Sequence, residues 1–494
     1  MKRTRWPVVI LILVAVVALL VWFPGTDDVG PSRVLRSPVA ASVGTEGGSW
    51  YCASSDVGVE APTHTVIVSA VSDEDALLRL DAFNGDGEVG TSELEVPGGT
   101  TAEVDASTAF DDPNVSVMVE ADAPVAVEHR YVYESGADQA PCTNFSSDTW
   151  YFPTLTTSRD AQARLSLFNP FPGDASVDIS IAFDSGVRQP TSLSGVVIPP
   201  GTTRVVELSE DVQRRDQFSA TITSRSGGVV AEVAQRFDGS GDIPVTGLRL
   251  VPGTRSAAPA WAFAGGFADS TAIETMSVLN PTDQSVDVLA QVVPYGSADL
   301  LPEPFELEIP KLRYGLVNLT EESRVQQVGY HAIDVEASGD GDVVSARALS
   351  ITGAPESEEA DEVRASITGG TTASSGASHS ARRWVAPGMA VGETSNSVVF
   401  VHNFGSDPAL VTVTGSPIDG SDGLSAELEI PPKESAAVNA DQLVEGAQTF
   451  TAGISSDNPV VVERLQIWTS PADLSIQSGI AVVETIDELF NLGD

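Results

Sequence analysis

The sequence has little lysine, histidine or cysteine, the residues that supply much of the chemistry of protein sites. It has 494 residues, of which five are histidine and two cysteine, and its lysines are Lys2, Lys311 and Lys433. The formal net charge is −43, from 26 Lys and Arg against 69 Asp and Glu. A field of this sign repels nucleic acid and anionic lipid, so we expect no nucleic-acid partner.

The short motifs of common enzymes are also missing. The sequence contains no G-x-S-x-G nucleophile motif, no P-loop and no H-E-x-x-H zinc motif, and its histidines are scattered singly. We therefore expect no catalytic residue, no metal site and no cofactor, in a protein that is not an enzyme.

The first thirty residues predict the compartment. Basic residues precede an uncharged apolar run over residues 6–23, and two aspartates follow it. As a helix this run is about 27 Å long, enough to span the hydrocarbon core of a bilayer. The flanking charges predict a single-pass protein of the cell membrane, with a cytoplasmic N-terminus and an extracytoplasmic bulk. A cleaved signal peptide, which would make the protein secreted, is the alternative.

The two cysteines agree with export. Cys52 and Cys142 are far apart in the sequence, and an oxidising compartment would join them. The chain-entropy model gives such a bridge roughly 4–5 kcal/mol. We predict a structural disulfide.

The rest of the chain repeats a set of landmarks four times, which indicates tandem duplication. Each copy opens with a tryptophan, has an asparagine at the end of an apolar strand, and later has a valine-rich strand, which ends in glutamate in three copies. These residues are Trp50, Trp150, Trp261 and Trp384; Asn84, Asn169, Asn280 and Asn403; and Glu128, Glu232 and Glu463. Asn84 lies farther from its tryptophan than the others do, and the third copy has Ala346 in place of the glutamate.

Inside each copy the hydrophobic period is two. Val177, Ile179, Ile181 and Phe183, for example, alternate with more polar neighbours. About seven short strands in about 110 residues predict an immunoglobulin-like β-sandwich, and a β-propeller is the alternative. We thus expect an all-β protein of four tandem sandwiches after one transmembrane helix. The predicted parts are a signal-anchor at 1–24, a linker at 25–48, and sandwiches at 49–145, 146–257, 258–380 and 381–494.

The third sandwich carries an acidic and Gly/Ser-rich arm at residues 353–381, which we interpret as an extended hairpin followed by a flexible joint. If the four sandwiches stack end to end, their array reaches on the order of 150 Å.

The layout of anchor, Trp-Tyr-Cys at residues 50–52, Asn-Pro turns and acidic body resembles an uncharacterised actinobacterial family of membrane-anchored or secreted proteins with tandem immunoglobulin-like repeats. The resemblance covers roughly residues 1–485. It implies location and fold, and no activity.

The repeated residues fit architecture better than chemistry. The asparagines are suited to Asx-turns, and the glutamates to packing or a surface ion pair with a neighbour such as Arg464. The tryptophans are either buried anchors, which we favour, or platforms that stack on sugar rings. We expect a non-enzymatic envelope protein that acts as spacer, scaffold or interaction module. Its expected partners are the cytoplasmic membrane, through residues 6–23, and an envelope protein or cell-wall glycan. The alternative function is a glycan-binding accessory of cell-wall polysaccharide assembly.

Overall fold

A computed structural model describes residues 47–54, 56–59, 62–242, 244–296, 301–325, 328–355, 362–482 and 489–491. The predicted transmembrane segment at residues 6–23 and nearly all of the linker lie outside these ranges. Within them, no helix is both long enough and apolar enough to cross a bilayer. The described chain is all-β, as expected, and its helices are single short turns: α2 (Ala106–Ala109), α3 (Leu208–Asp211), α4 (Glu362–Ser366), η1 (Thr191–Leu193), η3 (Leu319–Glu321) and η4 (Ala440–Gln442).

The first two modules each consist of two antiparallel sheets. In module 1 the strand orders are β1-β6-β3-β4 and β5-β2-β7-β8; in module 2 they are β12-β11-β15-β9, with β13 beside β11, and β14-β10-β16-β17. The strands of module 1 are β1 (Gly48–Cys52), β2 (Thr63–Ala70), β3 (Ala76–Phe83), β4 (Glu88–Val96), β5 (Thr101–Asp105), β6 (Ser116–Ala121), β7 (Val125–Tyr133) and β8 (Gly136–Pro141). Those of module 2 are β9 (Thr149–Leu155), β10 (Ala161–Asn169), β11 (Ala175–Phe183), β12 (Gly186–Arg188), β13 (Val196–Ile198), β14 (Thr202–Glu207), β15 (Phe218–Ser226), β16 (Val230–Asp238) and β17 (Thr246–Pro252).

Module 3 has the same orders, β18-β23-β20-β21 and β22-β19-β24-β25. Module 4 departs from them, because β31 belongs to both sheets and the additional strands β33 and β34 pair with β26. The strands of module 3 are β18 (Ala260–Ala268), β19 (Ala272–Asn280), β20 (Val286–Pro294), β21 (Phe305–Ile309), β22 (Arg313–Asn318), β23 (Gly329–Ala337), β24 (Val344–Ile351) and β25 (Gly370–Ser375). Those of module 4 are β26 (His379–Val391), β27 (Ser395–His402), β28 (Ala409–Pro417), β29 (Ser425–Ile430), β30 (Ser435–Asn439), β31 (Gln448–Thr469), β32 (Ala472–Ser478), β33 (Ile480–Ala481) and β34 (Leu489–Asn491). Strand β31 passes through both sheets, because it pairs with β26 and β28 and then with β27 and β32.

The alternating pattern in the sequence explains the sheets. Along β11, Val177, Ile179 and Ile181 are fully buried, whereas the intervening Asp178 and Ser180 are half-buried. Successive side chains of a strand point to opposite faces, so this spacing gives one apolar face that packs in the core. The apolar faces of the two sheets form a core in each of the first three modules, and each core also includes one to three buried residues of a neighbouring module.

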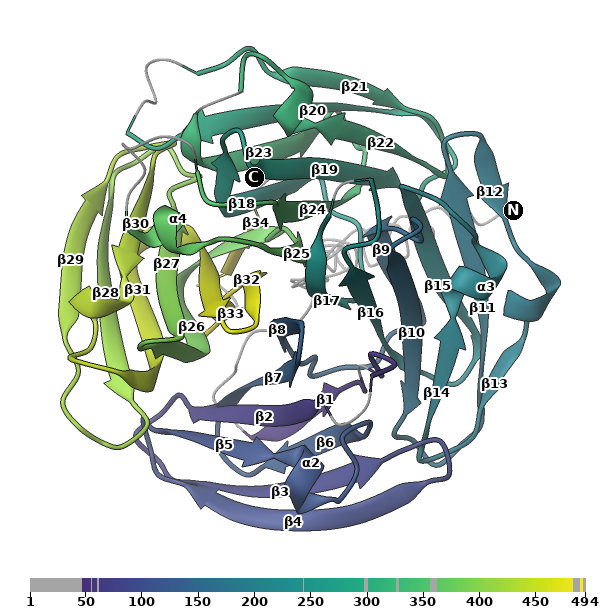
Figure 1. Ribbon diagram of the computed structural model, residues 1–494, viewed down its shortest axis with the longest axis horizontal. Coiled ribbons are helices and arrows are strands. Elements are labelled where there is room, and N and C mark those ends of the chain that lie inside the picture. Colours follow the sequence, from purple (N-terminus) through teal and green to yellow (C-terminus); the bar gives the residue numbers. More distant parts are fainter. Residues whose placement is uncertain are drawn as a thin grey trace, which may run out of the picture. The chain divides into compact units, whose positions relative to one another are not determined.

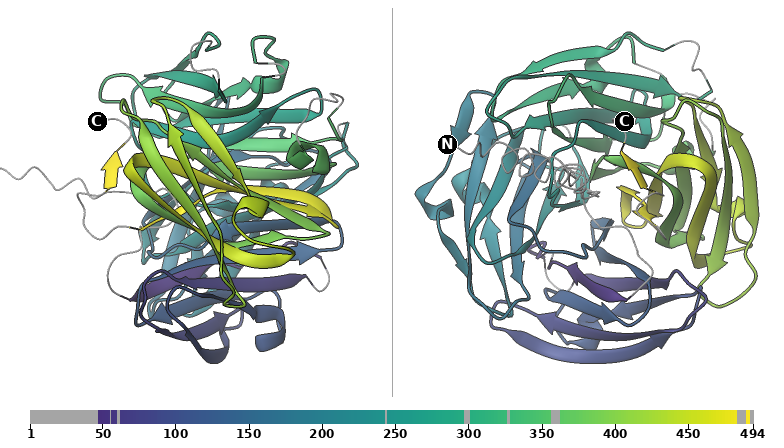
Figure 2. Two further views of the ribbon diagram at one scale, coloured as in Figure 1. Left: turned by 90° about the vertical axis from the view of Figure 1, so that its left-hand side faces the viewer. Right: turned by 180° about the vertical axis from the view of Figure 1, so that it is seen from behind.

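The four modules close into a ring (Figure 1). One strand of each module, β8, β17, β25 or β32, lies at the centre, and we call these the inner strands. Strand β8 contacts β17 and β32, and β25 contacts the same two, so each module has two neighbours and module 4 meets module 1. Figure 2 shows the closed arrangement from behind. The expectation of an end-to-end array on the order of 150 Å is therefore wrong. The ring shares closure with a propeller, but its units are two-sheet modules.

The Gly/Ser-rich stretch of the third module is part of this centre, and the interpretation as a flexible joint is wrong. Residues 370–375 form the inner strand β25, and all six are buried. Side chains this small allow four strands to approach one another closely. Gly370, with φ of +119°, shows why a larger residue would not fit, because a Cβ there would lie 2.5 Å from the Cα of Asp473 in β32.

Closure between the first and fourth modules rests partly on three buried hydroxyl groups. Ser69 Oγ lies 2.8 Å from Thr101 Oγ1 and 2.9 Å from Thr451 Oγ1, and the two threonine oxygens are 2.7 Å apart. Ser69 and Thr101 belong to module 1, and Thr451 belongs to β31 of module 4.

We predict that the double variant Ser69→Cys/Thr451→Cys forms a new disulfide in oxidising buffer, because the two hydroxyl oxygens are already in contact. Thiol counting after denaturation checks this, with each single variant as control. Two free thiols in the folded double variant would contradict ring closure.

Candidate functional site

The repeat glutamates lie at the boundaries between modules. Each of Glu128, Glu232 and Glu463 is buried and meets a basic side chain of the preceding module around the ring. His129 Nε2 of module 1 lies 3.0 Å from Glu232 Oε2 of module 2. Nη2 of Arg347 in module 3 lies 3.1 Å from Glu463 Oε1 of module 4.

The third pair closes the ring. Arg464 Nη1 of module 4 donates to Glu128 Oε2 of module 1, which also accepts a hydrogen bond from Gln139 Nε2 at 2.7 Å. The expected partner of the glutamates, an arginine such as Arg464, is present, but the pairs are buried and join different modules. Of the two expected roles of the glutamates, packing or a surface ion pair, the surface ion pair is therefore wrong, because both partners are buried. Burial raises the pKa of Glu463 above its ordinary value, and the charge of Arg347 opposes that rise.

The third copy, which has alanine in place of the repeat glutamate, fits the same pairing between neighbouring modules. The basic partner in each pair directly follows the repeat position of its own module, as His129, Arg347 and Arg464 do. In module 2 that next residue is Val233, and the repeat position of module 3, which it would meet, is Ala346. Both residues are fully buried. A cation and its acid are thus missing together at the repeat positions that face each other between modules 2 and 3, so that neither position buries an unpaired charge.

The repeat tryptophans are buried: Trp150 and Trp261 have 1% and 0% of their surface exposed. Their indole Nε1 atoms donate to equivalent carbonyl oxygens at the start of the valine-rich strand, at 2.9 Å for Trp150 to Val229 and 2.8 Å for Trp261 to Val343. Trp384 donates in the same way to Val460 at 3.0 Å, and Trp50 is buried as well. Buried rings cannot stack on a sugar, so these residues do not form the glycan platform that the sequence left open.

Three of the repeat asparagines make the same turn. Asn169, Asn280 and Asn403 follow or end the second strand of their modules, and each Oδ1 accepts the backbone N–H two residues later, as in an Asx-turn. Each Nδ2 donates across the turn to a carbonyl of the later strand that ends at proline. Asn84 also accepts from Asp86 N–H at 2.9 Å, but it follows β3, the third strand of module 1. Asn84 therefore lies farther from its tryptophan because its turn follows the third strand of the module and not the second.

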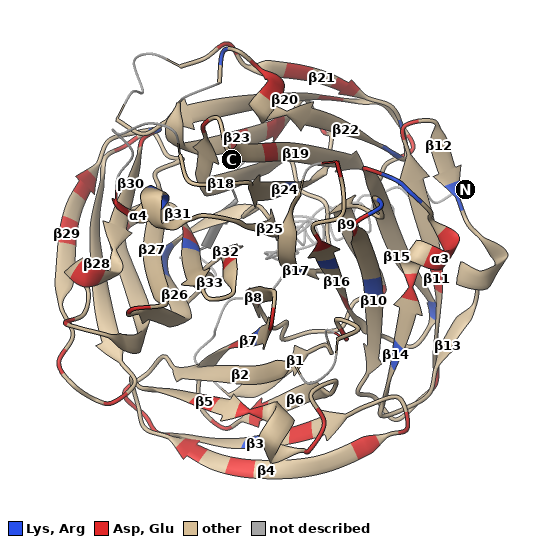
Figure 3. Cartoon of the chain, viewed as in Figure 1, with Lys and Arg blue, Asp and Glu red and all other residues tan. Residues whose placement is uncertain are grey.

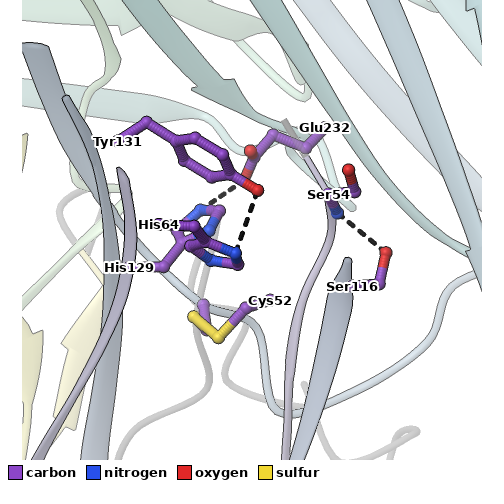
Figure 4. The surroundings of a disulfide bond; sticks show 8 residues. Cys52, Ser54, His64, Ser116, His129, Tyr131 and Glu232 are labelled. Atoms are coloured by element: carbon purple, nitrogen blue, oxygen red, sulfur yellow. Dashed lines mark hydrogen bonds and ion pairs between the residues drawn. A yellow bond between two sulfur atoms is a disulfide. The ribbon is translucent and has the colours of Figure 1, made fainter. Parts of the chain in front are cut away.

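The predicted disulfide is confirmed: Cys52 and Cys142 are bonded, with Cα atoms 4.6 Å apart. Close to it is a buried cluster, shown in Figure 4, in which Tyr131 Oη lies 3.1 Å from His64 Nδ1 while His129 meets Glu232. Burial lowers the pKa of His64 well below its ordinary value, and the charge of His129 adds to the effect. The cluster therefore holds a neutral His64 and serves the boundary between modules 1 and 2.

Two aspartates that sequence reasoning missed lie at the centre of the ring. Asp473 of β32 accepts backbone N–H groups from all three other modules, at 2.9 Å from Ala137, 2.8 Å from Leu248 and 2.8 Å from Thr371. Asp138 of β8 accepts the N–H of Leu250 in module 2 at 2.6 Å. The sequence does contain a signal for these two residues, because Asp138 and Asp473 each follow the repeat glutamate of their module by ten residues.

Burial dominates the electrostatics of these carboxyl groups. It raises the pKa of Asp138 to about 7 and that of Asp473 well above its ordinary value, although the backbone N–H donors oppose both shifts. The described residues hold no cluster of three or more His, Cys, Asp or Glu side chains that could bind a metal ion. We interpret the centre as a structural junction.

A cleft lies between modules 2 and 3, at the boundary whose repeat positions hold Val233 and Ala346 in place of an ion pair. Its volume is about 470 Å³, within the range of small-molecule sites. Its floor includes the buried Asp160, Phe237 and Arg249 of module 2 and Ser350 of module 3, and exposed acids stand at its rim. Hydrogen-bond donors, acceptors and apolar surface are all present in this one cavity.

Comparison with known proteins gives a partial family match. The model of a family of unknown function, DUF5719, matches residues 134–301, from the end of module 1 into module 3. This fits the expected resemblance to an uncharacterised family for that segment. No curated protein matches the chain.

Several solved structures show weak similarity. Thermotoga maritima 1070 is 21% identical over 21% of this chain and 97% of its own, with a TM-score of 0.20. A glycosyl hydrolase family 2 member from Bacteroides cellulosilyticus is 10% identical over 46% of this chain and 29% of its own, with a TM-score of 0.11. A glycoside hydrolase of family 32 from Bifidobacterium adolescentis is 10% identical over 90% of this chain and 98% of its own, with a TM-score of 0.12. Scores this low support no statement about fold or activity.

We predict that Glu232→Ala lowers the free energy of unfolding by about 1–3 kcal/mol, because it leaves the buried Nε2 of His129 without its partner. His129→Val/Glu232→Ala imitates the natural Val233 and Ala346 boundary, so it should lose less stability than the sum of the two single variants. Urea denaturation of all four proteins measures the coupling. Strict additivity would show that the pair does not act as a unit.

We predict that the free energy of unfolding depends on pH through Asp138. Because the pKa of Asp138 is raised to about 7, folding favours its protonated form. The stability that this group contributes is present at pH 4 and is lost as the pH rises to 7, by about 2–3 kcal/mol between pH 5 and pH 7. Asp138→Asn should flatten that part of the pH profile of unfolding free energy, and the exposed Asp340→Asn should not. Parallel profiles for Asp138→Asn and the wild type would contradict this assignment.

Proposed function

We propose that the protein is a non-enzymatic component of the cell envelope, a rigid ring-shaped scaffold that presents interaction surfaces outside the membrane. The observation that carries the proposal is the use of the repeat glutamates and tryptophans to join and fill modules. We further propose that the modules are immunoglobulin-like sandwiches, and that residues 6–23 anchor them to the membrane with the N-terminus in the cytoplasm. The disulfide supports an oxidising compartment.

The perimeter of the ring supports a scaffold that stays separate from its neighbours. The outer strands β4, β21 and β29 each carry a pair of exposed glutamates two positions apart (Figure 3), namely Glu93 and Glu95, Glu306 and Glu308, and Glu427 and Glu429, and β4 also carries the exposed Glu88. Charged side chains on edge strands prevent pairing with the edges of other molecules. The matching strand of module 2, β13, carries the half-exposed Val197 in their place. Module 2 therefore offers a different edge from the other three.

The cleft between modules 2 and 3 favours a second function, that of a glycan-binding accessory in cell-wall polysaccharide assembly. A cavity that combines hydroxyl, amide, carboxylate and guanidinium groups with an aromatic ring suits a sugar better than an apolar ligand. Glycan binding is compatible with a scaffold, because a ligand in the cleft would leave the outer strands β4, β21 and β29 accessible.

Cell fractionation tests the location. We predict that the full chain stays with the membranes after an alkaline wash and is degraded when protease is added to spheroplasts. The chain without residues 1–24 should remain in the soluble fraction inside the cell and be protected. Release of a shortened chain into the medium would favour the cleaved signal, and protection of the full chain would contradict an extracytoplasmic location.

Catalysis is tested separately. Residues 47–494, purified and incubated with a panel of chromogenic glycosides, should release no product. Hydrolysis that disappears in an Asp160→Asn variant would show that the cleft is an active site.

A further inference from the structure

The floor of the cleft between modules 2 and 3 holds two opposite charges that do not touch. Asp160 and Arg249 are 9% and 8% exposed, and both line the cavity. None of the described salt bridges joins them. The charges of Asp473 and Asp138 act on Arg249 more strongly than that of Asp160 does, but neither forms a described salt bridge with it. At the other three boundaries a buried glutamate meets a histidine or arginine side chain directly. Separated buried charges are costly unless something bridges them.

The guanidinium group of Arg249 is held in place by hydrogen bonds from two of its three nitrogen atoms. Its Nε donates to Thr371 Oγ1 at 2.7 Å and its Nη2 donates to Ser350 Oγ at 3.0 Å, both in module 3. The guanidinium lies over the ring of Phe237, with 4.6 Å between Cζ and the ring centroid. Among the described hydrogen bonds none involves Nη1. Burial lowers the pKa of Arg249 to about 10, which leaves the group charged at neutral pH.

Asp160 is also held in place, by a hydrogen bond to one of its two carboxylate oxygens. Ser158 Oγ donates to its Oδ1 at 2.8 Å, and no described hydrogen bond reaches its Oδ2. Gly241 packs closely against one side of the carboxylate, since a Cβ there would lie 2.6 Å from both Cγ and Oδ2 of Asp160. The cleft therefore offers one free carboxylate oxygen and one free guanidinium nitrogen, both preorganised by the fold.

We propose that this cleft binds a neutral saccharide, whose hydroxyl groups donate to Asp160 Oδ2 and accept from Arg249 Nη1. The inference rests on the glycan-binding function proposed above and gives it a site and a ligand class. A hydroxyl group is both donor and acceptor, so adjacent hydroxyls of one sugar ring satisfy both charged groups. A cavity of about 470 Å³ accommodates a small saccharide.

The charges around the cleft select against acidic sugars. Asp216 and Asp242 are exposed at its rim and Arg159 is the one exposed cation among the lining residues. The chain as a whole carries a formal charge of −43, which lowers the local concentration of anions further. A uronic acid would thus bind more weakly than the neutral sugar of the same configuration.

Titration calorimetry of residues 47–494 tests the proposal with glucose, galactose, mannose, N-acetylglucosamine and their oligosaccharides, together with glucuronic and galacturonic acid. We expect at least one neutral saccharide to bind, and its uronic acid to bind several-fold more weakly. Asp160→Asn should weaken binding about tenfold, because the amide replaces an acceptor of the sugar hydroxyls. The exposed Asp174→Asn, outside the cleft in the same module, is the matched control.

A second variant keeps the test decisive if Asp160→Asn does not fold. Thr275 is half-buried on β19 and lines the module 3 side of the cleft, so Thr275→Trp should block the cavity and abolish binding. Circular dichroism and melting curves confirm that each variant is folded. Saccharide binding that survives both substitutions would overturn the site while leaving glycan binding in place. Binding of no saccharide would overturn both, and a preference for the uronic acid would overturn the ligand class.

Discussion

The carboxylate of Asp473 is the interaction on which the ring depends most. Its two oxygens accept four backbone N–H groups, one from each of the three other modules and one from its neighbour Leu474 at 2.9 Å. A single side chain therefore fixes the inner strands β8, β17 and β25 relative to β32. Gly247 and Gly370 allow this approach, because a Cβ at either position would lie less than 3 Å from atoms of Asp473. Small residues at the centre are a consequence of packing four strands around one acid.

The boundaries show how a duplicated unit becomes a closed ring. The same two adjacent strand positions supply an acid to one neighbour and a cation to the other, as Glu463 and Arg464 do. Losing one member alone would bury an unpaired charge, so the boundary between modules 2 and 3 has lost both. The cleft with Asp160 and Arg249 lies at that boundary, where no direct ion pair at the repeat positions joins the modules.

Sequence patterns predicted the local features well, because these depend on neighbours in the chain. Alternation gave the strands, paired cysteines gave the disulfide, and the Asx-turns of Asn169, Asn280 and Asn403 lie where the motif indicates. Closure depends on contacts between residues such as Glu128 and Arg464, which are 336 positions apart, and nothing in the sequence shows which modules meet. The composition of residues 369–376 led to a wrong prediction. Small residues predict a flexible linker when the segment is considered alone, but here they are required because the strand lies at the crowded centre of the ring.

The central claim is that four modules form a closed ring, and small-angle X-ray scattering of residues 47–494 tests it most directly. A closed ring predicts a radius of gyration close to that of a compact chain of this length, about 22–25 Å. A maximum dimension on the order of 150 Å, as for four sandwiches in a row, would contradict the account.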